Sequence, residues 1–122
     1  MAAVTRNKAI FVSPPGYEVN DAGTLTEDVT AGDLLTNGAT GWSKAAAGVA
    51  EAHGIALTDG YSGQANFDIG IHGEMDGFSG MTPGASLYPS GAVAGGLDTT
   101  QPAGAVTRVR ASTDTRIRYS FV

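Results

Sequence analysis

Closely spaced turn signals are the feature that most limits what this chain can fold into. The 122 residues include 18 glycines and five prolines. Four pairs of neighbouring residues are typical of tight turns: Asn37-Gly38, Asp59-Gly60, Asp76-Gly77 and Pro83-Gly84. Short strands between frequent turns are the structure that such spacing favours. Because the length is that of one ordinary domain, we predict a single all-β domain.

Strand signals recur from residue 24 to the C-terminus. The clearest lies in residues 65–72, where Phe67, Ile69 and Ile71 alternate with polar residues or glycine, as in a strand with one buried face. The eight predicted strands cover residues 25–29, 33–36, 41–44, 54–58, 65–72, 85–88, 106–111 and 115–122. About eight short strands fit a small antiparallel β-barrel or sandwich.

Residues 1–23 are predicted to form an extended N-terminal arm, ahead of a single β domain at residues 24–122. Two adjacent prolines follow a short apolar run there; they keep the backbone extended and remove two hydrogen-bond donors. An extended arm can add as a strand to the sheet of a partner. The candidate assembly contacts in this arm are Ile10, Phe11, Val12, Pro14 and Pro15. The alternative is a first edge strand of the domain, followed by a tight turn.

Residues 44–53 fit a strand least well. They are rich in alanine and other good helix formers, and Gly54 could end a short helix. However, Gly48 interrupts the segment, and a helix of about ten residues is marginal without tertiary support. We therefore expect a loop or strand connection here in preference to a helix.

Positive charge is concentrated near the C-terminus, although the whole chain has a net charge of −5. Residues 1–105 carry three cations against eleven acids, whereas residues 106–122 carry four arginines against one aspartate. Such asymmetry favours a face that docks on something acidic, including a neighbouring copy of the chain; the alternative is an ordinary solvated basic face. The candidate assembly-interface residues in this segment are Arg108, Arg110, Arg116 and Arg118.

The numbering of these arginines predicts how the last two strands pair. All four are even-numbered, whereas the apolar residues around them are odd-numbered, so each strand has one basic and one apolar face. In a direct hairpin the apolar faces coincide only if paired residue numbers sum to an even value, as with Val109 opposite Ile117. This register also pairs Arg110 with Arg116 and Arg108 with Arg118. Because like charges directly opposite each other are destabilising, we expect acidic groups, from this chain or another molecule, over that face.

Residues that build catalytic or metal sites are scarce. The chain has no cysteine and two histidines, which leaves few options for a metal site or for a nucleophile with its base. We expect His53 and His72 to be surface or packing residues. Asp68, Glu74 and Asp76 lack calcium-loop spacing and are expected to be solvated acids in turns. The sequence therefore predicts no enzymatic activity, no cofactor and no metal.

Charge and hydropathy weigh against two further classes of partner. A chain of net negative charge is poorly suited to general nucleic-acid binding. No apolar run approaches the roughly 18 residues of a membrane span, and the apolar run near the N-terminus is too short for a signal peptide. We expect neither a nucleic-acid nor a membrane partner, and synthesis in the cytoplasm without a secretion signal.

Several short motifs follow one another between residues 31 and 102. They are Ala31-Gly32-Asp33-Leu34-Leu35, Gly41-Trp42-Ser43-Lys44-Ala45, His53-Gly54-Ile55-Ala56-Leu57-Thr58, Met81-Thr82-Pro83-Gly84-Ala85-Ser86-Leu87-Tyr88-Pro89-Ser90, and Gly95-Gly96-Leu97-Asp98-Thr99-Thr100 with Pro102. With the closing strand pair at residues 106–122, their order and spacing resemble those of the capsid decoration (cement) proteins of tailed bacteriophages. The four arginines of the closing strands depart from the more neutral positions of that family.

The resemblance implies a non-enzymatic structural virion protein. Such a protein decorates and stabilises the expanded capsid by binding across neighbouring major capsid subunits, as a homotrimer on the outer surface. The apolar core is thin, since 19 residues are alanine, and this favours assembly as a further source of stability. Similar modules occur in phage fibres. The alternative is therefore a tail-fibre, head-fibre or receptor-binding appendage module, including one that binds glycans.

Overall fold

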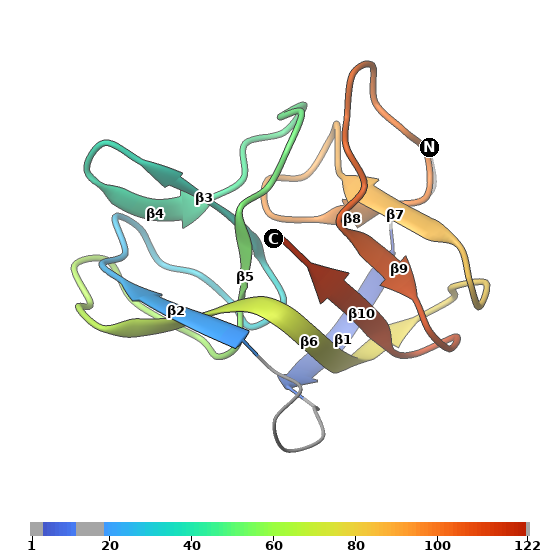
Figure 1. The fold of residues 1–122 in the computed structure, drawn as a ribbon, viewed down its shortest axis with the longest axis horizontal. Helices are drawn as coiled ribbons and strands as arrows, with labels where there is room; N and C mark the ends of the chain where they lie inside the picture. The colour runs from blue at the N-terminus through green and yellow to red at the C-terminus, as the bar shows by residue number, and fades with distance from the viewer. Residues whose placement is uncertain (1–3, 12–18, 122) are drawn as a thin grey trace.

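The structure, a computed structural model, describes residues 4–11 and 19–121. Within this part of the chain it contains ten β-strands and no helix (Figure 1). The strands are β1 Thr5–Phe11, β2 Val19–Gly23, β3 Leu34–Gly38, β4 Gly41–Lys44, β5 Gly54–Ala56, β6 Phe67–Ser79, β7 Ser86–Pro89, β8 Leu97–Asp98, β9 Val109–Ala111 and β10 Ile117–Ser120. The predicted all-β fold is confirmed, with ten strands in place of about eight.

The 13-residue strand β6 is the axis of the fold. Its start pairs with β2 on one edge and β5 on the other, so that Gly70 is opposite both Asn20 and Ile55. Its end pairs with β1 and β10, so that Met75 is opposite both Phe11 and Ile117. From β5 the sheet continues through β3 to β4, and from β10 through β9 and β7 to β8.

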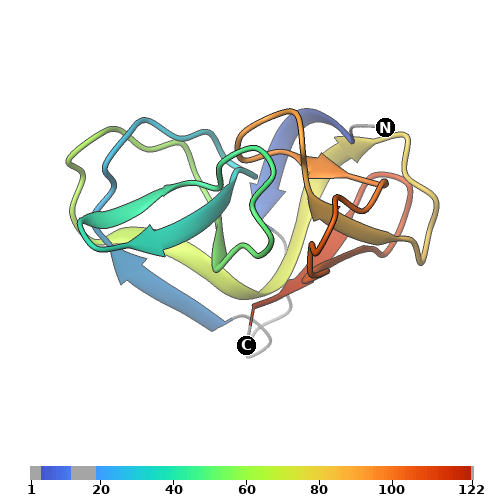
Figure 2. The same cartoon turned by 90° about the horizontal axis from the view of Figure 1, so that it is seen from above.

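Two lobes therefore diverge from β6 and form one curled, half-barrel sheet (Figures 1 and 2). We call the β2–β5 side, on the left in Figure 1, the first lobe. The second lobe consists of β1 and β7–β10, on the right. All the strand pairings of the sheet are antiparallel, which is the pairing that the sequence predicts.

Each lobe has its own apolar cluster. The first-lobe cluster consists of Leu25, Val29, Leu35, Trp42, Ala56, Phe67 and Ile69. The second-lobe cluster includes Met75, Phe78, Leu87, Val109, Ile117 and Tyr119, together with Leu34 and Ile55. Because side chains alternate along a strand, neighbours such as Leu34 and Leu35 enter different clusters. β5 and the start of β3 are thus buried on both faces and form the wall between the two cores.

Gly70 of β6 permits close packing beside this wall. A Cβ atom at this position would lie 2.7 Å from the Tyr119 hydroxyl oxygen and 2.8 Å from Leu57 Cδ2. Tyr119 is fully buried, so its ring passes over β6 only where the strand lacks a side chain. A glycine inside a strand usually weakens it, and here it allows close contact between the two lobes.

The described N-terminal residues belong to the sheet of their own chain. β1 and β2 lie in succession along the same edge of β6, which matches the alternative of an edge strand at the start of the domain. Within the predicted arm, Ile10 and Phe11 are in β1, opposite Asp76 and Met75. Val12, Pro14 and Pro15 lie outside the described residues. The role of these five residues in assembly stays a prediction.

Seven of the eight predicted strands overlap an observed one, and residues 25–29 do not. That segment forms two isolated bridges only, Leu25 with Trp42 and Val29 with Gly60. The alanine-rich segment 45–53 is an irregular connection, as predicted. The turn pair Asn37-Gly38 lies at the end of β3 in the β3–β4 hairpin, where Gly38 pairs with Gly41 and residues 39–40 make the turn.

Candidate functional site

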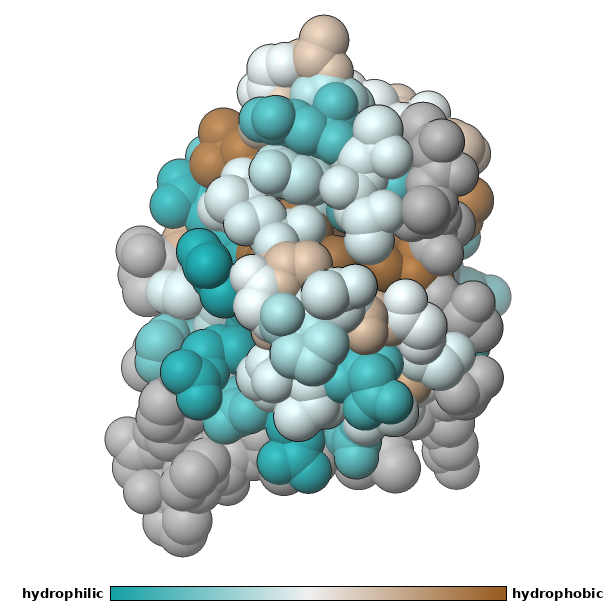
Figure 3. Space-filling model, turned by 90° about the vertical axis from the view of Figure 1, so that its right-hand side faces the viewer, coloured by the Kyte–Doolittle hydropathy of each residue, from teal (hydrophilic) through white to brown (hydrophobic). Residues whose placement is uncertain are grey.

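The second lobe presents a mainly polar surface. Hydrophilic and near-neutral residues cover most of the side seen in Figure 3, and hydrophobic ones are confined to small areas. Among residues 4, 6 and 21–121, the large apolar side chains that are exposed are those of Tyr61, Val93 and Val106. A partner that docks on the second lobe would therefore meet polar and charged groups in place of a broad apolar patch.

An arginine face forms the outside of β9 and β10. Along these strands buried and exposed residues alternate, because Val109, Ala111, Ile117 and Tyr119 point into the second-lobe core. The even-numbered residues are consequently directed outwards, as their numbering predicts. We define the arginine face as Arg110 and Arg118 within the strands, with Arg108 and Arg116 immediately before them.

The register of this hairpin differs from the predicted one by two residues. Ala111 pairs with Ile117, and Arg110 is opposite Arg118. Paired residue numbers sum to an even value, as predicted. The predicted pairs themselves are wrong, namely Arg110 with Arg116, Arg108 with Arg118 and Val109 with Ile117. The reason is a longer loop, residues 112–116 in place of 112–114. Its hydrogen bonds hold it closed: Thr113 Oγ1 accepts from Arg116 N–H at 2.9 Å, and the Arg116 carbonyl accepts from Ser112 N–H at 2.9 Å.

Three of the four arginines have a carboxylate of this chain within ion-pair distance. The pairs are Arg108–Glu51 at 2.9 Å, Arg116–Asp76 at 3.8 Å and Arg118–Glu74 at 3.8 Å. Glu74 and Asp76 come from β6, the neighbour of β10, and Glu51 from the loop before β5. The acidic groups expected over this face are thus supplied, for these three arginines, by the chain itself.

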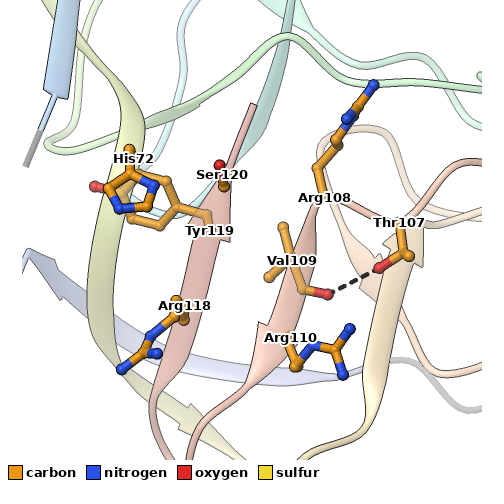
Figure 4. Close-up of a pocket in the computed structure, with 8 residues that line it drawn as sticks. All are labelled: His72, Thr107, Arg108, Val109, Arg110, Arg118, Tyr119 and Ser120. Atoms are coloured by element: carbon orange, nitrogen blue, oxygen red, sulfur yellow. Dashed lines mark hydrogen bonds between the residues drawn. The ribbon is translucent and has the colours of Figure 1, made fainter. Parts of the chain in front are cut away.

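Arg110 differs from the other three. Its side chain is exposed and forms no ion pair with any residue that the structure describes. Its cross-strand neighbours are Arg118 on β10 and Ser86 on β7. Figure 4 shows the guanidinium groups of Arg110 and Arg118 turned away from each other, the latter towards β6. The positive charge of Arg110 is therefore not compensated within the described chain.

A depression of about 400 Å³ opens on the arginine face. Its lining residues are His72, Thr107, Arg108, Val109, Arg110, Arg118, Tyr119 and Ser120 (Figure 4). Arg116 does not line it. Three arginines thus line an open hollow. Guanidinium groups bind carboxylates or phosphates through charge-assisted hydrogen bonds.

Asp76 marks the far end of the arginine face. The Gly77 N–H donates to Asp76 Oδ1 at 2.9 Å, and this bond lowers the pKa of the carboxyl below its ordinary value of 3.8. Thr115 and Arg116 act in the same direction, while desolvation opposes them. Asp76 is therefore ionised when it faces Arg116.

A second polar cluster, which sequence reasoning missed, joins β1 to β3. Arg6 Nη2 donates to Asp33 Oδ1 at 2.7 Å, and the Thr30 N–H donates to the other oxygen at 2.8 Å. Asp33 is 4% exposed. The signal available in the sequence was the position of Asp33 directly before two leucines, which places a charge immediately before a buried strand segment.

The remaining candidate residues have ordinary structural positions. His53 is exposed and its Nδ1 accepts from the Asn37 N–H at 2.9 Å. Asp68, Glu74 and Asp76 lie in β6 and not in turns, because that strand runs on through Gly73 and Gly77. Among the described residues, no group of three or more histidines, cysteines and acids comes together as metal ligands. The same part of the chain holds no helix with the length and hydropathy of a membrane span.

Comparisons of the chain with protein-family models, with curated proteins and with solved structures found no match.

Proposed function

We propose that this chain is a non-enzymatic structural protein of a tailed-bacteriophage virion. It decorates the outer surface of the expanded capsid as a homotrimer and stabilises the capsid by binding across neighbouring major capsid subunits. The motifs between residues 31 and 102 support this proposal through their order, which resembles that of capsid decoration proteins.

The places of these motifs in the fold give the resemblance a physical basis. Asp33 is buried in the turn before β3, and Trp42 is buried in the first-lobe cluster. Pro83-Gly84 forms the expected type II turn, since the Ala85 N–H donates to the Thr82 carbonyl and Gly84 has φ of 85°. These motif residues thus have structural roles in the fold of this chain.

The arginine face is the single observation that carries the proposed docking. It is a row of outward-facing arginines on a chain whose net charge is −5. Three of them face carboxylates of the chain, and Arg110 has no ion pair among the described residues. A face of this kind orients a protein on an acidic partner and accelerates their encounter. A second copy or a capsid subunit could supply the acidic surface, and a homotrimer would present three arginine faces to the lattice.

Stabilisation would follow from mass action. A protein that binds only the expanded lattice lowers the free energy of that lattice relative to every other state. Each contact can be modest, because a trimer that engages several subunits at once benefits from a high effective concentration.

The test is cosedimentation of the purified protein with isolated phage heads. We expect saturable binding to expanded heads and none to unexpanded shells of the same phage, which serve as the matched control. Absence of binding to expanded heads contradicts the proposal. Binding to host cells or their glycans in place of heads would support the appendage alternative.

A further inference from the structure

We propose that Arg110, together with Arg118 on the neighbouring strand, binds a carboxylate from an acidic segment of a partner protein. The inference deepens the proposed function and rests on it for the source of that segment, the capsid surface. It assigns the binding to one position of the arginine face and to one kind of chemical group.

The charge balance of the arginine face distinguishes Arg110 from the other three arginines. Arg108, Arg116 and Arg118 each face a carboxylate of this chain at 2.9 to 3.8 Å. Arg110 faces no such group among the described residues and has a like charge directly opposite it on β10. Opposed like charges destabilise a strand pair. An external anion at this point would remove that repulsion.

The geometry of the opposed pair Arg110 and Arg118 leaves room for an anion. Directly opposed residues in an antiparallel pair have Cβ atoms about 4.5 to 5.5 Å apart, yet the two guanidinium groups point to opposite sides in Figure 4. The space over the β9–β10 pair is left open. A carboxylate placed there can accept charge-assisted hydrogen bonds from Arg110, of the kind that planar guanidinium groups form best. The positive charge of Arg118 on the neighbouring strand adds electrostatic attraction at longer range.

The size and polarity of the depression favour an acidic side chain as its occupant. The depression of about 400 Å³ is far larger than one free ion, and it lies open on a sheet face. Its other walls carry hydrogen-bonding groups, among them Thr107 and Ser120. An acidic side chain on a polypeptide segment therefore fits the depression better than an isolated anion, and the polar surroundings favour it over an apolar segment.

The experiment is a titration of isotope-labelled full-length protein, followed by the NMR signals of the arginine Nε–H groups. The probe is a glutamate hexapeptide, and a glutamine hexapeptide of equal length is the neutral control. We expect saturable shifts at Arg110 and Arg118 with the glutamate peptide only. Arg110→Gln should weaken binding by about tenfold or more, the scale of one lost hydrogen bond to a charged group.

Arg116→Gln is the matched variant. It removes the same charge from the same face, but Arg116 faces Asp76 and does not line the depression. We expect peptide binding close to that of the unmodified chain. Equal weakening by both substitutions would show an effect of net charge alone and would overturn the inference. An equal response to inorganic phosphate at the same concentration would also overturn it, since the site would then bind any anion.

Two further outcomes separate this inference from the proposed function. If Arg110→Gln binds expanded heads as tightly as the unmodified chain does, the assignment of Arg110 to the docking site is wrong, and the proposed decoration of the capsid is unaffected. If the unmodified chain binds the glutamate peptide and no heads, the carboxylate site stands and decoration is wrong. If the unmodified chain self-associates and only Arg110→Gln abolishes this, the occupant is a second copy of the chain. That result would overturn the assignment of an acidic segment from a partner protein.

Discussion

Arg6 donates a 2.7 Å hydrogen bond to Asp33 and thereby ties β1 to the start of β3. The Asp33 side chain is 5% exposed and that of Arg6 is 26% exposed, so the pair is largely shielded from water. A buried carboxylate that loses its cation retains the cost of its desolvation. The first described strand is thus held to the domain by charge as well as by backbone pairing with β6.

Arg6→Gln should lower the free energy of unfolding by about 1 to 3 kcal/mol, less than for a fully buried pair because Arg6 is partly exposed. Urea denaturation measures the change. Arg116→Gln breaks the exposed 3.8 Å pair with Asp76 and should cost less than about 0.5 kcal/mol. Equal losses for the two variants would contradict the structural role of the Arg6–Asp33 pair.

Leu34 and Leu35 test whether the two cores form one cooperative unit. The two residues are adjacent on β3, yet they belong to different apolar clusters. Because β3 and β5 border both cores, each leucine-to-alanine variant should lose about 2 to 5 kcal/mol and still unfold in one calorimetric transition. Two separate transitions in either variant would show that the lobes unfold independently.

Gly70→Ala tests the close approach of Tyr119 to β6. The added methyl group would meet Tyr119, Leu57 and Ile55 at 2.7 to 2.9 Å. Overpacking of this kind costs about 1 to 3 kcal/mol, which thermal denaturation would detect. Gly38→Ala is the control, because the nearest atom to its Cβ is 3.7 Å away. A Gly70→Ala variant as stable as the unmodified chain would show that Tyr119 does not lie against this position.

Asp76 should make stability depend on pH in the acidic range. Its pKa is lowered in the folded chain, so its ionised form stabilises the fold above the ordinary value of 3.8. That contribution is lost as the pH falls through the lowered pKa. Asp76→Asn should therefore melt below the unmodified chain at about pH 7, and the two should converge near about pH 2. A difference that persists unchanged at the lower pH would contradict this role.

The alternation of apolar and polar residues predicted where strands occur better than it predicted their lengths or pairing partners. The apolar residues Phe67, Ile69 and Ile71 correctly predict the start of β6. The strand then continues to Ser79, although Asp76-Gly77 is a turn pair in sequence. Pairing with β1 and β10 on both edges keeps that segment extended, and such pairing is a tertiary effect that a local motif does not contain.

The arginine face also combines a feature that local sequence predicts with features that tertiary structure determines. Even numbering predicts that the arginines share one side of the sheet, because parity follows from the pleat of a strand. The pairing of Arg110 with Arg118 depends on the hydrogen bonds of loop 112–116, which local parity cannot specify. Among the described residues, the lack of an ion pair at Arg110 depends on which acids β6 and the loop before β5 bring near its neighbours. No sequence pattern reports those long-range positions.

The melting of phage heads tests the central proposal most directly. Expanded heads emptied of DNA are heated with and without a saturating amount of the purified protein, and their disruption is followed by calorimetry. A protein that binds the expanded lattice and not the dissociated subunits must raise the melting temperature of the heads. We predict such a rise, which increases with occupancy until the sites are full. Binding without any rise in melting temperature would contradict a stabilising decoration protein.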